Sequence, residues 1–180
     1  MFSVGILTIS DKGSRGERED LSGPEIRQVI ASLPARVDAY EVIPDEEEMI
    51  AEKLMDYADR KRLDLILTTG GTGLSPRDVT PEATRKVLEK EIPGIAEAMR
   101  AEGIKITPLA MLSRAAAGTR GCSLIINLPG SPRAVRENLT VILPILKHAL
   151  EKVQGDLSEC GNLEVPSPRA NPGRPINSPD

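Results

Sequence analysis

The segment 68–84, which reads TTGGTGLSPRDVTPEAT, holds the residues best suited to bind phosphate groups. Its three glycines have no Cβ atom, so backbone N–H groups can approach an anion or a ring closely. Their spacing matches neither the P-loop nor the Rossmann fingerprint. Tight turns would explain one or two glycines, but not an irregular stretch that also holds Arg77 and Asp78. The segment is therefore interpreted as a functional loop.

Two carboxylates, Asp45 and Asp78, follow apolar runs that have the character of neighbouring strands. Loops that leave the carboxyl ends of parallel strands meet at one edge of the sheet, so the two side chains can converge on one crevice. Carboxylate and water ligands suit Mg²⁺, which neutralises phosphate charge during nucleotidyl transfer from ATP. Asp45 could equally serve only as a helix N-cap, and Asp78 could be a turn residue.

Arg133 and Arg136 occupy the first turn of a helical pattern over Pro132–Val153, where the helix dipole disfavours cations. An anion bound at the helix N-terminus would explain them, and two solvated surface arginines would explain them equally well. The pair Ser113-Arg114 supplies a further hydroxyl and guanidinium, which alone is a weak signal.

Alternating strands and helices must position these side chains. Short apolar runs without alternating polarity are typical of strands buried on both faces; they lie at Val4–Ser10, Val37–Ile43, Leu63–Thr69 and Ser123–Leu128. Helical spacing is found at Pro24–Leu33, Glu46–Arg62, Pro81–Lys90, Ile95–Ala101 and Pro132–Val153. This order predicts a mainly parallel sheet with helices on both faces.

The sequence also marks where helices begin. Ser22 and Glu25 have the spacing of a capping box, with Ser22 at the N-cap. Asp45 precedes three glutamates, which the helix dipole favours in a first turn. Thr80 and Ser131 are each followed by proline, which is typical of an N-cap residue before position N1.

Four loops are expected at the carboxyl edge of the sheet, each rich in Gly, Pro, Asp or Ser. They are Ser10-Asp11-Lys12-Gly13, Pro44-Asp45, Thr69-Gly70-Gly71-Thr72-Gly73 and Pro129-Gly130-Ser131. A site assembled from these loops would lie outside the strand ends, as ligands do in open α/β sheets.

Composition limits the remaining classes of function. The formal net charge of −4 and only three aromatic residues argue against a nucleic-acid surface. Cys122 and Cys160 are too few for a disulfide scaffold and suit a reducing compartment. The single histidine, His148, falls in a helical pattern and is expected to be a solvated helix residue. No signal peptide is recognised, so a cytoplasmic location is expected.

The length of 180 residues predicts one domain, assigned to residues 1–154. The remaining segment, residues 155–180, carries five prolines and few apolar residues without periodicity. It is expected to be a disordered tail, because it cannot bury enough surface to offset its ordering entropy.

The sequence resembles the molybdopterin adenylyltransferase family, which includes the G domain of gephyrin. The central loop carries the strongest match, and further segments follow in the family's order between Val4 and Glu151: ILTISDKGS, DLSGPEI, IPGIAEAMR, MLSRAAAG and IINLPGSPRAVRENL. The short chain is similar to the branch named molybdenum cofactor biosynthesis protein B.

The resemblance implies a three-layer α/β/α sandwich with a mostly parallel sheet and one antiparallel strand. It places a short strand near Ala115–Thr119, paired with Ser123–Leu128, that the periodicity does not reveal. It also implies self-association into a trimer or a hexamer.

For the site, the resemblance implies that Asp45, Asp78 and Ser113 are catalytic, with Asp45 and Asp78 holding Mg²⁺. The expected nucleotide-binding residues are Gly70, Gly71, Thr72 and Gly73. The expected pterin-binding residues combine family positions with the chemistry noted above; they are Ser10, Asp11, Ser113, Arg114, Leu128, Pro129, Gly130, Ser131 and Arg133.

The expected activity is transfer of AMP from Mg-ATP to the phosphate of molybdopterin, with release of pyrophosphate. The attacking phosphate is already anionic at neutral pH, so no strong general base is needed. A non-catalytic molybdopterin-binding protein is the alternative, and it would not need the two carboxylates. A scaffold protein is less favoured, because the chain has no linker to a second domain.

Overall fold

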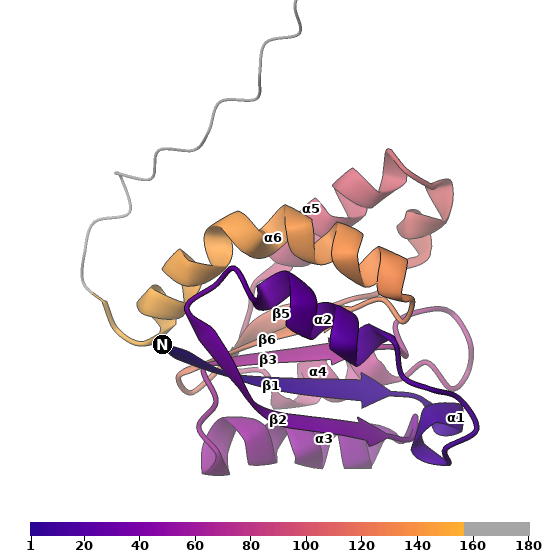
Figure 1. Ribbon diagram of the computed structural model, residues 1–180, viewed down its shortest axis with the longest axis horizontal. Helices are drawn as coiled ribbons and strands as arrows, with labels where there is room; N and C mark the ends of the chain where they lie inside the picture. The colour runs from indigo at the N-terminus through magenta and orange to yellow at the C-terminus, as the bar shows by residue number, and fades with distance from the viewer. Residues whose placement is uncertain (157–180) are drawn as a thin grey trace, which may run out of the picture.

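A six-stranded sheet forms the centre of the molecule in a computed structural model that describes residues 1–156 (Figure 1). The strand order is β2-β1-β3-β6-β5-β4. The strands are β1 (Phe2–Ile9), β2 (Ala35–Ile43), β3 (Leu65–Thr69), β4 (Lys90–Glu91), β5 (Ala117–Arg120) and β6 (Ser123–Leu128). β1 pairs in parallel with β2 and β3, and β3 with β6, whereas β5 is antiparallel to both of its neighbours. The predicted mostly parallel sheet with one antiparallel strand is confirmed.

Helices cover both faces of this sheet, which confirms the predicted three-layer sandwich. The helical elements are α1 (Asp11–Ser14), α2 (Ser22–Ile30), α3 (Glu47–Met55), α4 (Thr80–Val87), α5 (Pro93–Ile104) and α6 (Pro132–Val153), with a π-helical turn at Asp56–Arg60 and a 3₁₀ helix, η2, at Pro108–Leu112. The helices α2, α5 and α6 pack on one face, and α3 and α4 pack on the other (Figure 1). No helix within residues 1–156 is long and apolar enough to span a bilayer.

The central strands bury side chains on both faces, which explains why their sequences show no alternation of polarity. On β3, Leu67 faces the layer of α2, α5 and α6, and Ile66 faces the layer of α3 and α4; both are fully buried. On β6, Ile126 faces the layer of α2, α5 and α6, and Ile125 faces the layer of α3 and α4. Burying each such side chain contributes about 1.5–3 kcal/mol, so the sheet is held firmly between its two helical layers.

Periodicity located every strand longer than four residues and every helix longer than five, with boundary differences of a few residues. It missed α1, β4 and η2, because elements of two to five residues are too short to display a period. The strand β5 matches the one that the family resemblance implied. Of the tail predicted for residues 155–180, all but the first two residues lie outside the described part of the chain.

The predicted helix caps were right in one case and wrong in three. Ser131 caps α6, because its Oγ accepts a hydrogen bond from Ala134 N. Ser22 does not cap α2: the N–H groups of Ser22 and Gly23 donate instead to Asp20 Oδ1, at 2.8 and 3.2 Å. The Ser22 hydroxyl donates to Gly130 O (2.8 Å) and thereby ties α2 to the loop after β6.

Thr80 and Asp45 are the other two misassigned caps. Thr80 is the first residue of α4, and its side chain makes no capping hydrogen bond. The residue before α3 is Glu46, and Asp45 uses its carboxylate elsewhere. Short polar side chains bond to whichever backbone groups the tertiary fold brings near, and spacing along the chain does not report those groups.

Candidate functional site

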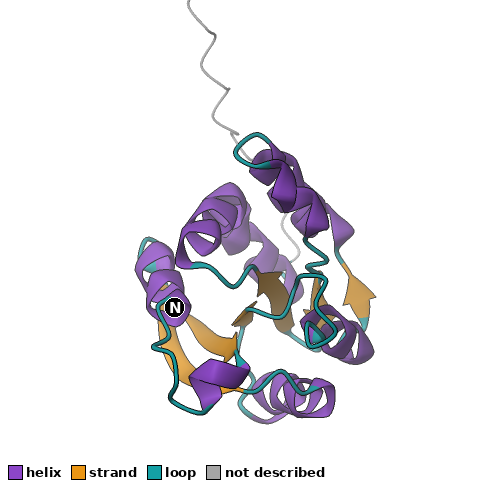
Figure 2. Cartoon of the chain, turned by 90° about the vertical axis from the view of Figure 1, so that its right-hand side faces the viewer, coloured by secondary structure: helices purple, strands orange, loops and turns teal. Residues whose placement is uncertain are grey.

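A pocket of about 570 Å³ opens at the edge of the sheet where β1, β3 and β6 end. The arrowheads of β1, β2 and β3 in Figure 1 point to this edge, which faces the viewer in Figure 2. The lining contains residues of all four predicted loops; these are Ser10, Gly13, Asp45, Thr69, Gly70, Gly71, Gly130 and Ser131, joined by Asp78. The predicted convergence of the loops on one crevice is thus observed.

Three glycines, Gly70, Gly71 and Gly130, shape the loops at the point where those after β1, β3 and β6 approach one another. Gly70 and Gly71 have φ values of +99° and +62°, a region that favours glycine. A Cβ atom built on Gly70 would lie 2.2 Å from Ile9 O, and one built on Gly130 would lie 3.3 Å from the Gly70 Cα atom. Larger residues at these positions would push the loops apart and displace the carboxylates that they carry.

Asp45 is half-buried and held by a reciprocal pair of hydrogen bonds with Asp11. The N–H of Asp11 donates to Asp45 Oδ2 (2.7 Å), and the N–H of Asp45 donates to Asp11 Oδ1 (3.1 Å). Burial raises the pKa of Asp45, and the negative charges of Asp11 and Asp78 raise it further. Asp45 is therefore placed in the pocket at an electrostatic cost, which a solvated N-cap would not incur.

Asp78 reaches the same pocket from within the glycine-rich loop. Its Oδ2 accepts a hydrogen bond from Ser75 N (2.8 Å), and its own N–H donates to Ser75 O (2.9 Å). This pair of bonds closes the turn that contains Arg77. Because the turn is closed locally, the carboxylate has a fixed position relative to the glycines.

Arg77, which precedes Asp78 in the chain, forms ion pairs with two other acidic residues, Asp11 and Glu46. It binds Asp11 through Nη2 (2.9 Å) and Nε (3.1 Å), and Glu46 through Nη2 (3.0 Å). The Arg77 guanidinium is also the main reason why the pKa of Asp11 is lowered. Among the described residues, neither Asp45 nor Asp78 forms an ion pair, so both face the pocket without a cation of their own.

The donor set suits a hydrated divalent cation better than a cation enclosed by protein. No group of three or more His, Cys, Asp or Glu residues within 1–156 is arranged to hold a metal ion. Mg²⁺ typically takes one or two carboxylates and completes its octahedron with water and substrate phosphates. Asp45 and Asp78 together meet that requirement.

Arg114 fastens the glycine-rich loop to the segment that follows η2. Its Nε donates to Gly73 O (2.7 Å), its Nη2 donates to Asp78 O, and its Nη1 pairs with Glu82. Its backbone N–H donates to Thr72 O (3.0 Å). Arg114 was predicted to contact the pterin. Its contacts also give it a structural role, because the guanidinium holds both ends of the loop that carries Asp78.

Replacing Arg114 with Lys is expected to loosen this loop. The planar guanidinium of Arg114 contacts the carbonyls of Gly73 and Asp78 and the carboxylate of Glu82 at the same time. The single ammonium group of lysine cannot contact all three. The loss should lower the free energy of unfolding by about 1–3 kcal/mol. Urea denaturation at neutral pH would measure it, with Arg27→Lys as the control on an exposed position of α2. Unchanged stability in Arg114→Lys would contradict the clamp.

A second, smaller cavity of about 260 Å³ contains Ser113. Thr72, Gly73 and Pro129 also line it, and their chain neighbours Gly71 and Gly130 line the first pocket. The remainder of its wall is mostly apolar and comes from Met99, Leu109, Ala110, Leu112 and Ala134, with Arg100, Thr107, Glu137 and Asn138 as polar members. The predicted site residues thus occupy two adjoining cavities. One contains Asp45 and Asp78 together with the acids Glu19 and Asp20, and the other is mainly apolar.

Some predicted site residues line neither cavity. Leu128 is fully buried in the core, and Asp11 is engaged by Arg77 beside the first pocket. Arg133 pairs with Glu137 (2.7 Å) and Arg136 with Glu25 (2.6 Å). These acidic partners account for both arginines in the first turn of α6 without a bound anion.

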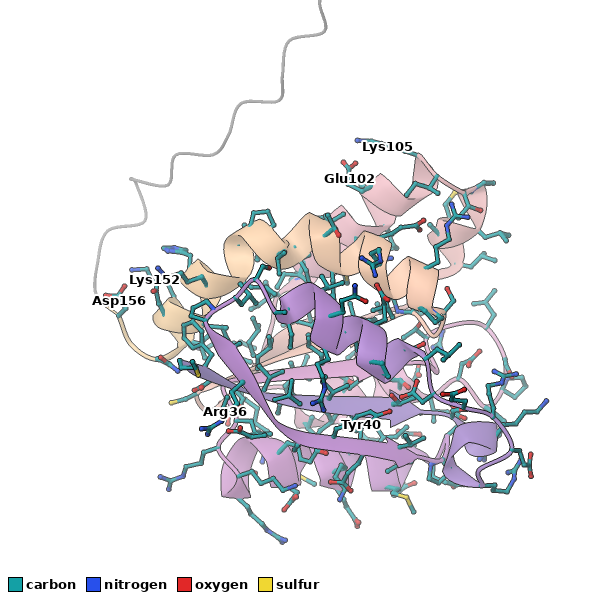
Figure 3. All side chains as sticks on the ribbon, in the orientation of Figure 1. Arg36, Tyr40, Glu102, Lys105, Lys152 and Asp156 are labelled. Atoms are coloured by element: carbon teal, nitrogen blue, oxygen red, sulfur yellow. The ribbon has the colours of Figure 1, made fainter. Side chains whose placement is uncertain are left out.

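Sequence reasoning missed Asp20, which organises one wall of the first pocket. Its carboxylate accepts hydrogen bonds from Thr8 Oγ1 (2.5 Å), Tyr40 OH (2.5 Å) and two N–H groups of α2. Burial alone would raise the pKa of Asp20, but these hydrogen bonds more than offset it and the pKa is lowered. Figure 3 shows Tyr40 on the edge strand β2. The spacing Asp20-x-Ser22-Gly23, typical of an Asx turn, could have identified it.

Comparison with known proteins places this architecture among relatives that handle molybdopterin. A family model described as a probable molybdopterin binding domain matches residues 5–148. Over 164 residues the chain is 41% identical to the molybdopterin adenylyltransferase of Helicobacter pylori J99, covering 90% of this chain and 93% of that protein. It is 39% identical to the molybdopterin adenylyltransferase of Escherichia coli K12, covering 76% and 71%.

A solved structure resembles the whole fold. The molybdopterin biosynthesis enzyme MoaB from Thermus thermophilus superposes with a TM-score of 0.83 at 59% sequence identity. The match covers 87% of this chain and 98% of that one. The arrangement of strands and helices described above is therefore shared with an enzyme of molybdopterin biosynthesis.

Proposed function

This chain belongs to the family of molybdopterin-binding domains, and we propose that it is a molybdopterin adenylyltransferase of molybdenum cofactor biosynthesis. The reaction joins an oxygen of the molybdopterin phosphate to the α-phosphorus of ATP. The bond from that phosphorus to the β-phosphate oxygen breaks, and pyrophosphate leaves. Relatives that are about 40% identical over most of the chain carry the name of this activity.

The observation that carries the proposal is the pair of pocket carboxylates, Asp45 and Asp78, which form no ion pair within residues 1–156 and lie beside a glycine-rich loop. A protein that only bound molybdopterin, itself anionic, would gain nothing from two acids at this place. Mg²⁺, held by Asp45 and Asp78 and by the phosphates, would neutralise charge on the α-phosphate and on the leaving group.

The two cavities suggest how the substrates are arranged. The triphosphate of ATP binds in the first pocket, where Gly70 and Gly71 bring the backbone close to it. The apolar cavity at Ser113 accepts a ring system, and the boundary residues Thr72 and Gly73 lie where the reacting phosphates meet. Ser10 and Gly130, which the family resemblance assigns to the pterin, line the first pocket as well, so the molybdopterin phosphate would meet the triphosphate there.

The test is direct turnover. Purified protein is incubated with molybdopterin and Mg-ATP, and the adenylylated pterin and pyrophosphate are quantified by mass spectrometry and a coupled assay. Equal amounts of both products are expected, and chelation of Mg²⁺ should stop their formation. Binding of molybdopterin without either product would favour the non-catalytic alternative.

We also propose that the chain self-associates as a trimer or hexamer in the cytoplasm, where ATP is abundant. Between α5 and Ser113, five large apolar side chains are 44–70% exposed: Ile104, Ile106, Leu109, Met111 and Leu112. Large exposed apolar side chains concentrated in one short segment are typical of a protein interface. The exposed ion pair Lys105–Glu102 lies at the C-terminal end of α5, where this segment begins (Figure 3).

Leu109→Glu is expected to disrupt this association, because it places a charge among these apolar side chains. Light scattering coupled to size-exclusion chromatography should give an oligomer for the wild type and a monomer for the variant. Ile145→Glu, on an exposed position of α6, is the control. An unchanged oligomer in Leu109→Glu would place the interface elsewhere.

A further inference from the structure

Thr80 carries a buried hydroxyl group that the fold does not use. The residue is fully buried at the start of α4, and its Oγ1 has no hydrogen-bond partner among the described residues. Buried hydroxyls are normally paired, because an unpaired polar group loses its hydration without compensation. Thr84, one turn later and equally buried, has such a partner, since Asn127 Nδ2 donates to its Oγ1 (2.8 Å).

The unused hydroxyl lies beside a predicted catalytic residue. A Cβ atom built on Gly71 would lie 2.2 Å from Thr80 Oγ1 and 3.2 Å from Asp45 Oδ1. The two oxygens are therefore on the same side of Gly71, so the fold holds the Thr80 hydroxyl next to Asp45 Oδ1. The N–H of Thr80 donates to Gly71 O (3.1 Å), which fixes the hydroxyl relative to the glycine-rich loop.

The other Asp45 oxygen is already occupied. Asp45 Oδ2 accepts from Asp11 N, so Oδ1 is the atom that points toward Gly71 and Thr80. An orienting contact on that side would restrict the rotation of the carboxylate. A carboxylate that is already fixed binds a hydrated cation more tightly, because binding then costs less side-chain conformational entropy.

We propose that Thr80 is a positioning residue whose hydroxyl, held next to Asp45 Oδ1, orients the Asp45 carboxylate for binding of Mg-ATP. The inference rests on the proposed function. It assigns to Thr80 a role that a residue merely packing the start of α4 would not have. The Thr80 side chain itself does not line the pocket, so it acts through Asp45.

Thr80→Val and Thr80→Ser separate the hydroxyl from the shape of the side chain. Valine keeps the branched shape and removes a polar atom without a protein partner, so the melting temperature of the unliganded protein should be equal or higher. Calorimetric titration with Mg-ATP should show affinity at least fivefold weaker in Thr80→Val and within twofold of wild type in Thr80→Ser. Thr84→Val is the control: it removes a paired hydroxyl and should lower the melting temperature.

A double-mutant cycle tests whether Thr80 acts through Asp45. In an Asp45→Asn background, adding Thr80→Val should weaken Mg-ATP binding no further. A second, independent loss in that background would overturn the inference, as would a Thr80→Val protein with wild-type affinity or a clearly lower melting temperature. Wild-type protein that binds no Mg-ATP would instead overturn the proposed function, and this inference with it.

Discussion

Replacing Asp78 with Asn is expected to abolish AMP transfer while leaving the fold and molybdopterin binding intact. The side-chain oxygen of Asn can still accept the hydrogen bond from Ser75 N, so the turn around Arg77 should keep its geometry. The variant loses the negative charge that Mg-ATP requires. Because Asp78 has no ion pair among the described residues, no protein cation is left unpaired by the change.

The loss in kcat/KM should be at least a hundredfold, equivalent to about 2.7 kcal/mol of transition-state stabilisation. Steady-state rates at saturating Mg²⁺ would measure it, together with the melting temperature and the Kd for molybdopterin. Asp38→Asn is the matched control, since this carboxylate pairs with Arg36 on the surface strand β2 (Figure 3) and should retain activity within twofold. Near wild-type turnover in Asp78→Asn would refute the assignment.

The second large effect is expected for Asp45→Asn, which should transfer AMP at least tenfold more slowly. Asn keeps an acceptor for Asp11 N, so the loops after β1 and β2 remain joined. The structure removes the alternative in which Asp45 matters only as the cap of the helix that follows it, because its carboxylate does not cap α3 and binds Asp11 N instead. A stable Asp45→Asn enzyme with full activity would contradict the proposed role in binding the cation.

Stability should respond to Asp45→Asn in a pH-dependent way. The pKa of Asp45 is raised on folding, first by burial and then by Asp11 and Asp78, so ionisation of this group opposes folding. This cost is absent below the unfolded-state pKa, near about 3.9, and is complete above the raised folded-state pKa. The variant should therefore gain stability relative to wild type as the pH rises through that interval, and thermal unfolding at pH 4 and pH 7 would test the sign.

The elements of the fold could be predicted from local patterns. Buried strands such as β6 reveal themselves through short runs rich in Leu and Ile, and α6 through a helical period that lasts 22 residues. The site's general location also followed, because parallel strands bring their carboxyl-end loops together whatever the loops contain. Glycines at Gly70 and Gly71 and carboxylates at Asp45 and Asp78 were therefore recognisable as candidates before any contact was known.

The partners of the polar side chains were decided only by the tertiary structure. Arg114 was predicted to bind a ligand, yet its guanidinium contacts Gly73, Asp78 and Glu82, which are 32–41 residues away in the sequence. For Asp45 the sequence left open a role as cap of the helix that follows, yet its carboxylate binds Asp11 from the neighbouring loop. Ser22 lost its capping role to Asp20, two residues earlier.

The physical reason is the difference between burial and hydrogen bonding. Hydrophobic burial has no direction and adds over many residues, so a period along the chain is enough to report it. A hydrogen bond depends on distance and angle between two particular groups, and those are fixed only when the strands, helices and loops have packed. The sequence determined which loops carry the chemistry, and packing determined whether each side chain faces a substrate or another part of the protein.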